Sequence, residues 1–195
     1  LMGRMPGDYW RQFANLRLLL LYQMTHPGKK LNFMGSELAT FIEWREYEEL
    51  EWFLLDFEAH AKHKDYVRAL NRFYKSEIAL WSNDHDWSGF TWLDADNSRQ
   101  NILTYIRTSA GGRSRLICAL NFGVQTYKRF RIGVPKPGIY REVFNSDAPS
   151  YGGSGKILSE PIKAEEIPMH GQPYSIEITI PPVGGSVWKR SNRKG

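Results

Sequence analysis

The spacing of apolar residues changes near residue 86, and no other feature of the sequence constrains the fold as strongly. Before this point, apolar residues recur at three- and four-residue intervals, which is typical of helices with one buried face. After it, short runs alternate, as where Phe130, Ile132 and Val134 are separated by arginine or glycine. Such alternation is typical of antiparallel strands. We therefore expect two domains, residues 1–85 and residues 86–195, with different architectures.

The first domain is expected to begin with a helix over about residues 9–24. Phe13, Leu16 and Leu20 recur on one face of that segment. Asp8 precedes it, and its carboxylate can accept hydrogen bonds from the free amides of the first helical turn. The sequence therefore predicts a helix that is capped at Asp8 and buried along one face.

A short buried strand is expected at residues 31–34, where an apolar run follows a Pro-Gly turn. An acidic, aromatic loop over 35–57 and a second helix over about 61–75 come next. Helix, strand, loop and helix in this order indicate the last strand-helix part of a TIM (β/α)8 barrel, in which the residues just past each strand face the active site. One strand cannot close a barrel, so we expect the missing N-terminal part of the barrel to precede residue 1 and to be a partner of this chain.

The second domain is expected to be an all-β sandwich. Short alternating runs follow one another without an intervening helical pattern, and turn residues such as Pro135 and Gly138 lie between them. The expected strands cover residues 89–93, 101–107, 115–122, 127–134, 138–144, 174–180 and 185–189.

Composition and charge argue against several classes of function. The net charge is +5, but four positive charges lie in the run 189–194, which is typical of a solvated end, so we expect no nucleic-acid binding. No apolar run approaches the roughly 18 residues of a membrane span, and we expect no membrane association. The single cysteine, Cys118, lies in an apolar run and is expected to be buried. We expect a cytoplasmic protein. We also expect no metal or cofactor, because the five histidines are scattered and residues 152–155 lack the lysine of a phosphate-binding loop.

A set of short motifs follows a fixed order along the chain. In the first domain these are MPGDYW (5–10), FANLR (13–17), HPGKKL (26–31) and FMGSE (33–37), and in the second GFTWLD (89–94), RIGVP (131–135), NSD (145–147), YGGS (151–154) and HGQP (170–173). The ordered set resembles the C-terminal segment of the 1,4-alpha-glucan (glycogen) branching enzymes, which belong to the alpha-amylase family of glycoside hydrolases. The resemblance covers the chain from about Arg4 to Trp188. It implies the end of the catalytic barrel followed by the family's all-β C-terminal domain.

The resemblance implies a retaining glycosyl transfer on an α-glucan such as glycogen or amylose. A carboxylate attacks the anomeric carbon of an α-1,4 link, a carboxylic acid protonates the leaving oxygen, and a covalent glycosyl-enzyme forms. The 6-hydroxyl of another glucose then resolves that intermediate, which leaves an α-1,6 branch in glycogen biosynthesis. The resemblance puts the nucleophile, the general acid and a third carboxylate after the fourth, fifth and seventh barrel strands, before residue 1. The parent protein is thus expected to be an enzyme, whereas this chain alone has no catalytic residue and should be inactive.

Four residues are candidates for contact with the glucan. Trp10 could stack on a sugar ring while Asp8 accepts hydrogen bonds from hydroxyl groups, since both lie beside the expected barrel mouth. Glu37 follows the expected strand, and Trp44 lies in the acidic loop. Each has a structural alternative: helix or loop capping for the carboxylates, and packing for the two tryptophans.

Other interpretations of the sequence stay open. The loop after Glu37 departs from the family pattern, because LAT (38–40) and IEW (42–44) replace an aromatic-Gly-Gln run and Arg-Glu-Trp. The motif Asp84-His85-Asp86 mimics a catalytic His-Asp pair, but it follows the last helix and is expected to be an exposed linker. A hydrolase that uses Glu37 with another loop carboxylate, a non-catalytic carbohydrate-associated module, and the end of another alpha-amylase relative, such as a hydrolase or a trehalose-forming enzyme, are the alternatives.

Overall fold

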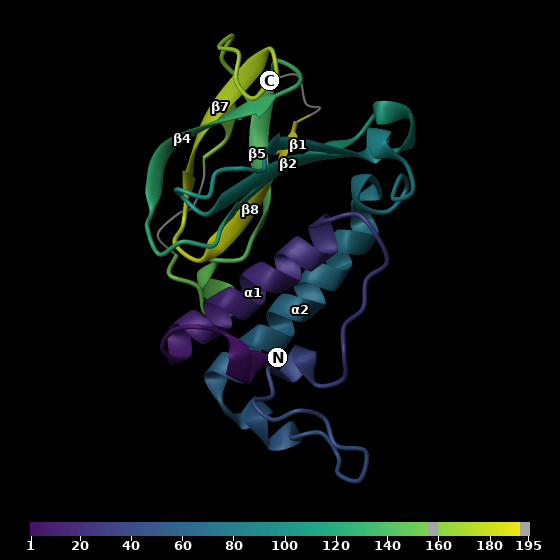
Figure 1. The fold of residues 1–195 in the computed structure, drawn as a ribbon, viewed down its shortest axis with the longest axis vertical. Coiled ribbons are helices and arrows are strands. Elements are labelled where there is room, and N and C mark those ends of the chain that lie inside the picture. The colour runs from purple at the N-terminus through teal and green to yellow at the C-terminus, as the bar shows by residue number, and fades with distance from the viewer. Residues whose placement is uncertain (156–159, 192–195) are drawn as a thin grey trace.

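A computed structural model describes residues 1–155 and 160–191, and it places two long helices beside a part of the chain that is built from two β-sheets (Figure 1). The helices are α1 (Tyr9–Thr25) and α2 (Glu58–Ser76), where the sequence predicts helices over about 9–24 and 61–75, and they lie side by side. Asp8 caps α1 as expected, because its carboxylate accepts a hydrogen bond from the Arg11 amide at 2.9 Å. The described 3₁₀ helices are η1 (Met2–Arg4), η2 (Ser36–Leu38), η3 (Trp52–Asp56), η4 (Ile78–Leu80), η5 (Trp87–Gly89), η6 (Ala110–Gly112) and η7 (Pro149–Tyr151).

The second half of the chain is all-β, as predicted. Its described strands form a six-stranded sheet in the order β1-β2-β3-β8-β5-β6 and a two-stranded sheet of β4 and β7, with every neighbouring pair antiparallel. Seven strands agree with the expected ranges to within about two residues, and β6 lies in a stretch that the alternation did not mark. The strands are β1 (Phe90–Asp94), β2 (Ile102–Thr108), β3 (Arg115–Asn121), β4 (Tyr127–Val134), β5 (Ile139–Asn145), β6 (Ile162–Lys163), β7 (Tyr174–Ile180) and β8 (Gly184–Arg190).

The inner strands β2, β3 and β8 of the six-stranded sheet are buried on both faces. On β3, Ile117 and Ala119 point into the core between the two sheets, where Ile132 and Ile176 oppose them. Alternate residues of the same strand point to the other face and join the core formed with the helices, and burial raises the pKa of Cys118 there to about 12. A strand with two buried faces reads as a continuous apolar run, which explains the sequence from 116 to 120. One continuous core joins the helices to the sheet. The division into two domains near residue 86 stays a prediction.

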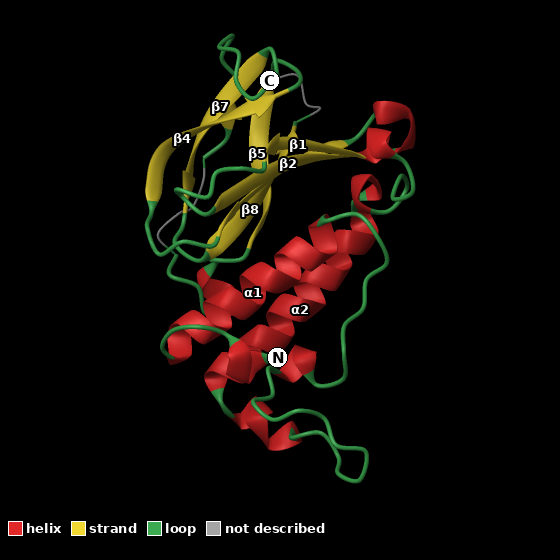
Figure 2. Cartoon of the chain, in the orientation of Figure 1, coloured by secondary structure: helices red, strands yellow, loops and turns green. Residues whose placement is uncertain are grey.

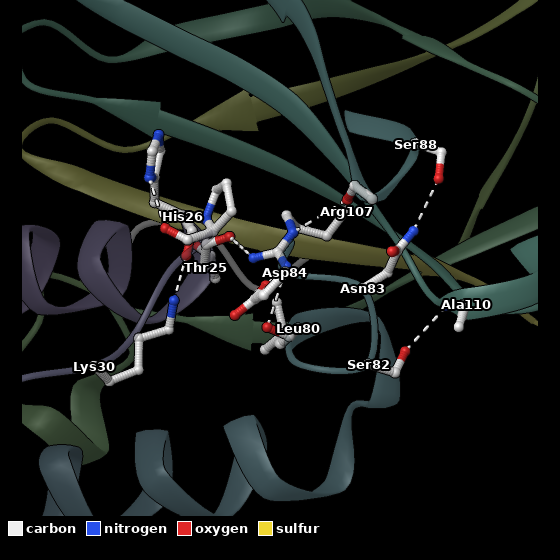
Figure 3. Close-up of polar contacts among 12 residues, drawn as sticks. Thr25, His26, Lys30, Leu80, Ser82, Asn83, Asp84, Ser88, Arg107 and Ala110 are labelled. Atoms are coloured by element: carbon white, nitrogen blue, oxygen red, sulfur yellow. Dashed lines mark hydrogen bonds and ion pairs between the residues drawn. The ribbon is translucent and has the colours of Figure 1, made fainter. Parts of the chain in front are cut away.

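A buried arginine joins the helices to the sheet (Figure 3). Arg107 on β2 is 0% exposed, and its guanidinium donates hydrogen bonds to the carbonyl oxygens of Thr25 at 2.7 Å, Leu80 at 3.1 Å and Gly89 at 3.3 Å. It also forms an ion pair with Asp84. The expected exposed linker Asp84-His85-Asp86 is therefore corrected in part: the Asp84 carboxylate is almost buried, because it neutralises this guanidinium.

Two histidines of α2 hold the loop that contains η2. The Nδ1 of His60 lies 2.7 Å from the Leu38 carbonyl oxygen, and the Nε2 of His63 lies 3.1 Å from that of Ser36. Both rings are buried, and each must donate because a carbonyl oxygen only accepts. Burial, with smaller effects of Arg17 and His60, lowers the pKa of His63 to about 4. A neutral His63 ring thus fixes the position of Ser36 and of the adjacent Glu37.

The strand expected at residues 31–34 is not present. The segment is irregular, and Leu31, Phe33 and Met34 are 78%, 59% and 50% exposed. A barrel strand is held by hydrogen bonds to strands on both sides, and no described residue of this chain pairs with the segment. The apolar run therefore lies on the surface, and the barrel part of the expected fold stays a prediction.

We expect Arg107→Met to lower the free energy of unfolding of the chain by about 3–5 kcal/mol, because Asp84 and three carbonyl groups would lose their buried partner. The measurement is urea unfolding followed by tryptophan fluorescence. Arg68→Met is the matched control, since its ion pair with Asp65 is exposed and should contribute less than about 1 kcal/mol. Equal losses in the two variants would contradict the role given to Arg107.

We expect His63 to make the chain less stable in acid. Its folded pKa of about 4 lies below its ordinary value of 6.5, so the unfolded state binds the proton more readily, and stability falls as the pH drops through that range. The full loss is about 3 kcal/mol. Urea unfolding at a series of pH values should show a shallower dependence for His63→Gln, whose amide can still donate to Ser36. The exposed His85 is the control, and the idea fails if His63→Gln and His85→Gln keep the same pH dependence as the unaltered chain.

Candidate functional site

The segment between α1 and α2 forms an exposed aromatic face. It runs back along the helices and reaches the end of the molecule that is farthest from the sheets (Figure 2). Large apolar side chains along it are exposed, although their neighbours on the helices are buried. The exposed members are Leu31, Phe33, Met34, Phe41, Ile42, Trp44, Tyr47, Trp52, Phe53 and Phe57. A patch of this kind marks a surface that contacts a ligand or another part of a protein.

A cavity of about 510 Å³ opens on this aromatic face. Trp44 and Phe33 form part of its wall, with their ring centroids 6.1 Å apart in an edge-to-face arrangement. At its rim, Arg4 forms an ion pair with Glu43 at 3.0 Å. Flat aromatic walls with a few polar groups at the rim suit a ligand that has both apolar faces and hydroxyl groups.

A second site surrounds Trp10 at the N-terminus of α1. Trp10 lies between a cavity of about 570 Å³, which Asp8 also lines, and one of about 200 Å³, which Tyr151 also lines. Its indole Nε1 donates a hydrogen bond to the carbonyl oxygen of Gly152 at 2.9 Å. The indole N–H is therefore occupied, and Trp10, which is 38% exposed, can offer only its ring face to a ligand.

The glycine-rich loop beside Trp10 is held in place by a buried arginine of α1. Arg17 donates from Nε to the Ser146 carbonyl oxygen at 2.9 Å, and a second nitrogen reaches that of Gly152 at 3.4 Å. A Cβ on Gly153 would lie 2.1 Å from the backbone carbonyl of Asp147, so this position requires glycine. The motif at 151–154 is therefore a tightly folded loop that closes one side of the Trp10 site.

The structure brings together some of the predicted site residues. Asp8 and Trp10 share one cavity wall, although the Asp8 carboxylate is also engaged as the cap of α1. Trp44 lies in the separate cavity of the aromatic face. Glu37 is half-buried in η2 and lines none of the cavities described here. The roles of all four residues in binding stay predictions.

Sequence reasoning missed Tyr151 and Arg17 as parts of the Trp10 site. Tyr151 is separated from Trp10 by more than a hundred positions, and no local pattern indicates the contact. A signal for Arg17 existed, because a charged residue stands among the leucines of α1 at a position that the helical period makes apolar. Burial lowers the pKa of this guanidinium, while Tyr66 and Asp147 favour its charged form.

No cluster of metal-ligating side chains occurs within residues 1–155 and 160–191. In the same part of the chain, no helix combines the length and the apolar character that crossing a bilayer requires. The cavity of about 510 Å³ on the aromatic face is lined by one carboxylate, Glu43, and a smaller neighbouring cavity beside Trp44 is lined by Glu43, Glu48, Glu49 and Glu51. The ring faces and carboxylates of these cavities suit the binding of a ligand that has hydroxyl groups.

Comparison with known proteins identifies the family to which the chain belongs. Residues 92–191 match the family described as alpha amylase, C-terminal all-beta domain. The chain is 49% identical over 193 residues to the 1,4-alpha-glucan branching enzyme GlgB of Halothermothrix orenii, covering 99% of this chain and 31% of that protein. It is 47% identical over 191 residues to GlgB 1 of Clostridium perfringens, covering 97% of this chain and 28% of that protein. The chain thus spans less than a third of the length of these relatives.

Solved structures share the fold at low sequence identity. A structure of AmyP in complex with maltotriose superposes with a TM-score of 0.64 at 10% identity, over 94% of this chain and 36% of that one. The isomaltulose synthase of a Klebsiella species gives a TM-score of 0.56 at 12% identity, over 91% and 38%. Together with the match over residues 92–191, these findings show that the chain belongs to the alpha-amylase C-terminal all-beta domain family, and that it is similar over almost its whole length to 1,4-alpha-glucan branching enzymes.

Proposed function

We propose that the chain is the C-terminal part of a 1,4-alpha-glucan branching enzyme, which cleaves an α-1,4 glucan chain and transfers it to a 6-hydroxyl to make α-1,6 branches during glycogen biosynthesis. The single observation that carries the proposal is the 49% identity to a branching enzyme across 99% of the chain. The parent is then a glycosyltransferase of the alpha-amylase family, and we propose that it acts in the cytoplasm.

In this proposal the chemistry belongs to the part of the parent protein that precedes the chain. A retaining transfer needs a carboxylate nucleophile and a carboxylic acid on the two sides of the scissile bond. The Asp84 carboxylate is used by Arg107 and the Asp8 carboxylate caps α1, so neither is placed for that task. The chain then contributes structure and glucan contacts, and the catalytic carboxylates come from elsewhere in the barrel.

We propose that residues 1–85 complete the barrel as its last strand-helix part. The exposure of Leu31, Phe33 and Met34 supports this, because neighbouring strands would bury those side chains and supply the backbone partners that a strand at 31–34 lacks. The aromatic face would then be partly covered by the preceding part of the parent protein. The segment that joins α1 to α2 would lie at the mouth of the barrel.

We propose that the glucan contacts in this chain come from Asp8, Trp10, Glu37 and Trp44. Support for Trp10 is strongest, since one ring face borders open cavities while the indole N–H is fixed by Gly152. Trp44 presents a ring in the cavity of the aromatic face, and Asp8 adds a carboxylate beside Trp10. For Glu37 the support is limited to its position after residues 31–34, on the loop that His60 and His63 hold.

Branching activity should require the longer protein. In an iodine-stain assay on amylose, the 195-residue chain should leave the stain unchanged, and a chain that includes the upstream coding sequence should shift it. Binding of soluble glucan by the silent short chain would show that it also acts as a carbohydrate-binding module. Branch formation by the short chain alone would overturn the proposal and would direct attention to Glu37 and the acidic loop.

Replacement of Trp10 should weaken glucan binding by the longer protein. We expect Trp10→Ala to raise the KM for amylose about fivefold, because one ring-stacking contact is lost, while Trp10→Phe retains most of the affinity. Trp87→Ala is the control, since Trp87 is 89% exposed and lies in η5, outside the cavities described above. If Trp10 only packs against the glycine-rich loop, the Trp10→Ala variant will lose stability but keep its KM.

A further inference from the structure

A cavity of about 300 Å³, here called the basic pocket, lies at the edge of the β part, away from the aromatic face and the Trp10 site. Its cationic wall is assembled from separate elements: the turn before β3, the start of β3, the turn between β4 and β5, and the end of β8. These elements contribute Arg113, Arg115, Lys136, Lys189 and Arg190. The residues are up to 77 positions apart, so the fold and not a local run of sequence concentrates the charge.

Most of the positive charge in the basic pocket is uncompensated. Lys189 forms an ion pair with Glu77 of the α2–η4 junction at 2.7 Å. The other four cations have no ion pair among the described residues, and no carboxylate lines the cavity. Like charges around a concave, partly enclosed surface reinforce one another, and a bound anion would relieve their repulsion.

Tyr140 fixes the geometry of the pocket. It forms part of the wall, and its hydroxyl donates a hydrogen bond to the Lys136 carbonyl oxygen at 2.9 Å, which holds the turn that carries Lys136. Burial raises the pKa of Tyr140, whereas its hydrogen bond to the Lys136 carbonyl and the charges of Arg190 and Arg115 act in the opposite direction. Gly138 makes room for one of these guanidinium groups, because a Cβ there would lie 2.8 Å from the Nε of Arg190.

Ser114 supplies an independent sign of a missing partner. It lines the same pocket between Arg113 and Arg115, and its hydroxyl oxygen is buried without a hydrogen-bond partner among the described residues. Buried hydroxyl groups are nearly always paired, so this oxygen lacks a partner that a bound molecule or a water could supply.

We propose that the basic pocket binds a phosphate group as a dianion, either as inorganic phosphate or as the phosphate ester of a small sugar. Guanidinium groups match the oxygens of phosphate with paired hydrogen bonds, and lysine adds a compact positive charge. The volume suits a small ligand, and the apolar side chains of Ile78 and Pro135 in the wall could pack against a sugar ring. A nucleic acid would instead need a basic stripe along a face. The proposal does not rest on the branching activity.

The test is isothermal titration of the 195-residue chain with sodium phosphate at constant ionic strength, with chloride as the replaced anion. We expect one site, and we expect Arg115→Gln and Arg190→Gln each to weaken binding about tenfold or more, since each removes a charge-assisted contact. Arg99→Gln is the matched control, because Arg99 is exposed on the loop between β1 and β2, outside the pocket. Absence of binding, or an equal loss in the control, would overturn the proposal.

A second measurement uses the unaltered chain, so its result does not depend on whether the variants fold. Amide NMR spectra of the unaltered chain, titrated with inorganic phosphate, should show the largest shifts at Ser114, Arg115 and Arg190. Shifts spread evenly over all basic residues would mean non-specific charge attraction and would sink the idea.

Parallel titrations with glucose 6-phosphate and glucose identify the source of the phosphate. Tighter binding of the ester than of inorganic phosphate at the same amides would assign the pocket to a sugar phosphate, with its ring against Ile78 and Pro135. Equal affinities would assign it to free phosphate. Binding of glucose as tightly as its phosphate would overturn the proposal, because phosphate would then play no part in recognition.

Discussion

The arrangement of helices and sheets depends on one buried cation. Arg107 stands on β2, the second strand of the six-stranded sheet, and its side chain is fully buried, so an unpaired charge there would be strongly destabilising. Its partners are the last carbonyl of α1, the last carbonyl of η4, the residue before β1, and Asp84. The end of α1 is a favourable place for a cation because its terminal carbonyls point outward from the helix. A single guanidinium thus joins the end of α1, the end of η4 and the start of β1.

The position of α1 on the sheet follows from this anchor and from a glycine. At Gly185 of β8, a Cβ would lie 2.5 Å from the side chain of Leu120 and 3.1 Å from that of Leu21. The missing side chain lets Leu21 approach the strand closely while Arg107 holds the helix end. At the opposite end of the same helix, Trp10 meets the glycine-rich loop through its bond to Gly152. The Trp10 site is therefore positioned by a helix that is fixed at both ends against the β part.

The features that were predictable from the sequence are those with a strong local pattern. The alternation around Ile132 gives β4, and the capped apolar helix after Asp8 gives α1. Arg107 escaped prediction because a polar residue in an alternating strand is ordinarily assigned to the solvent face. The two residues of β6 are too few to show a period. Residues 31–34 are irregular in this chain, and an apolar run alone does not distinguish a paired strand from a surface that awaits a partner.

The candidate site was predictable to a smaller extent, for the same physical reason. Asp8 and Trp10 are two positions apart on one helix start, so their proximity is local, whereas the bond from Trp10 to Gly152 crosses 142 positions. Contacts at such separations depend on tertiary packing, which no period encodes.

The distribution of positive charge could likewise be predicted from the sequence only in part. The run after Lys189 is conspicuous in the sequence as a basic end, yet Arg190 acquires its neighbours Arg115 and Lys136 only when β3, β5 and β8 are assembled. The fold therefore separates two surfaces that composition alone would merge: an aromatic face built from the segment between the helices, and a cationic pocket built from strand ends. The first surface offers ring faces to a ligand with hydroxyl groups, and the second offers cations to phosphate oxygens. The two surfaces share no lining residue, so a substitution in one should leave binding at the other unchanged.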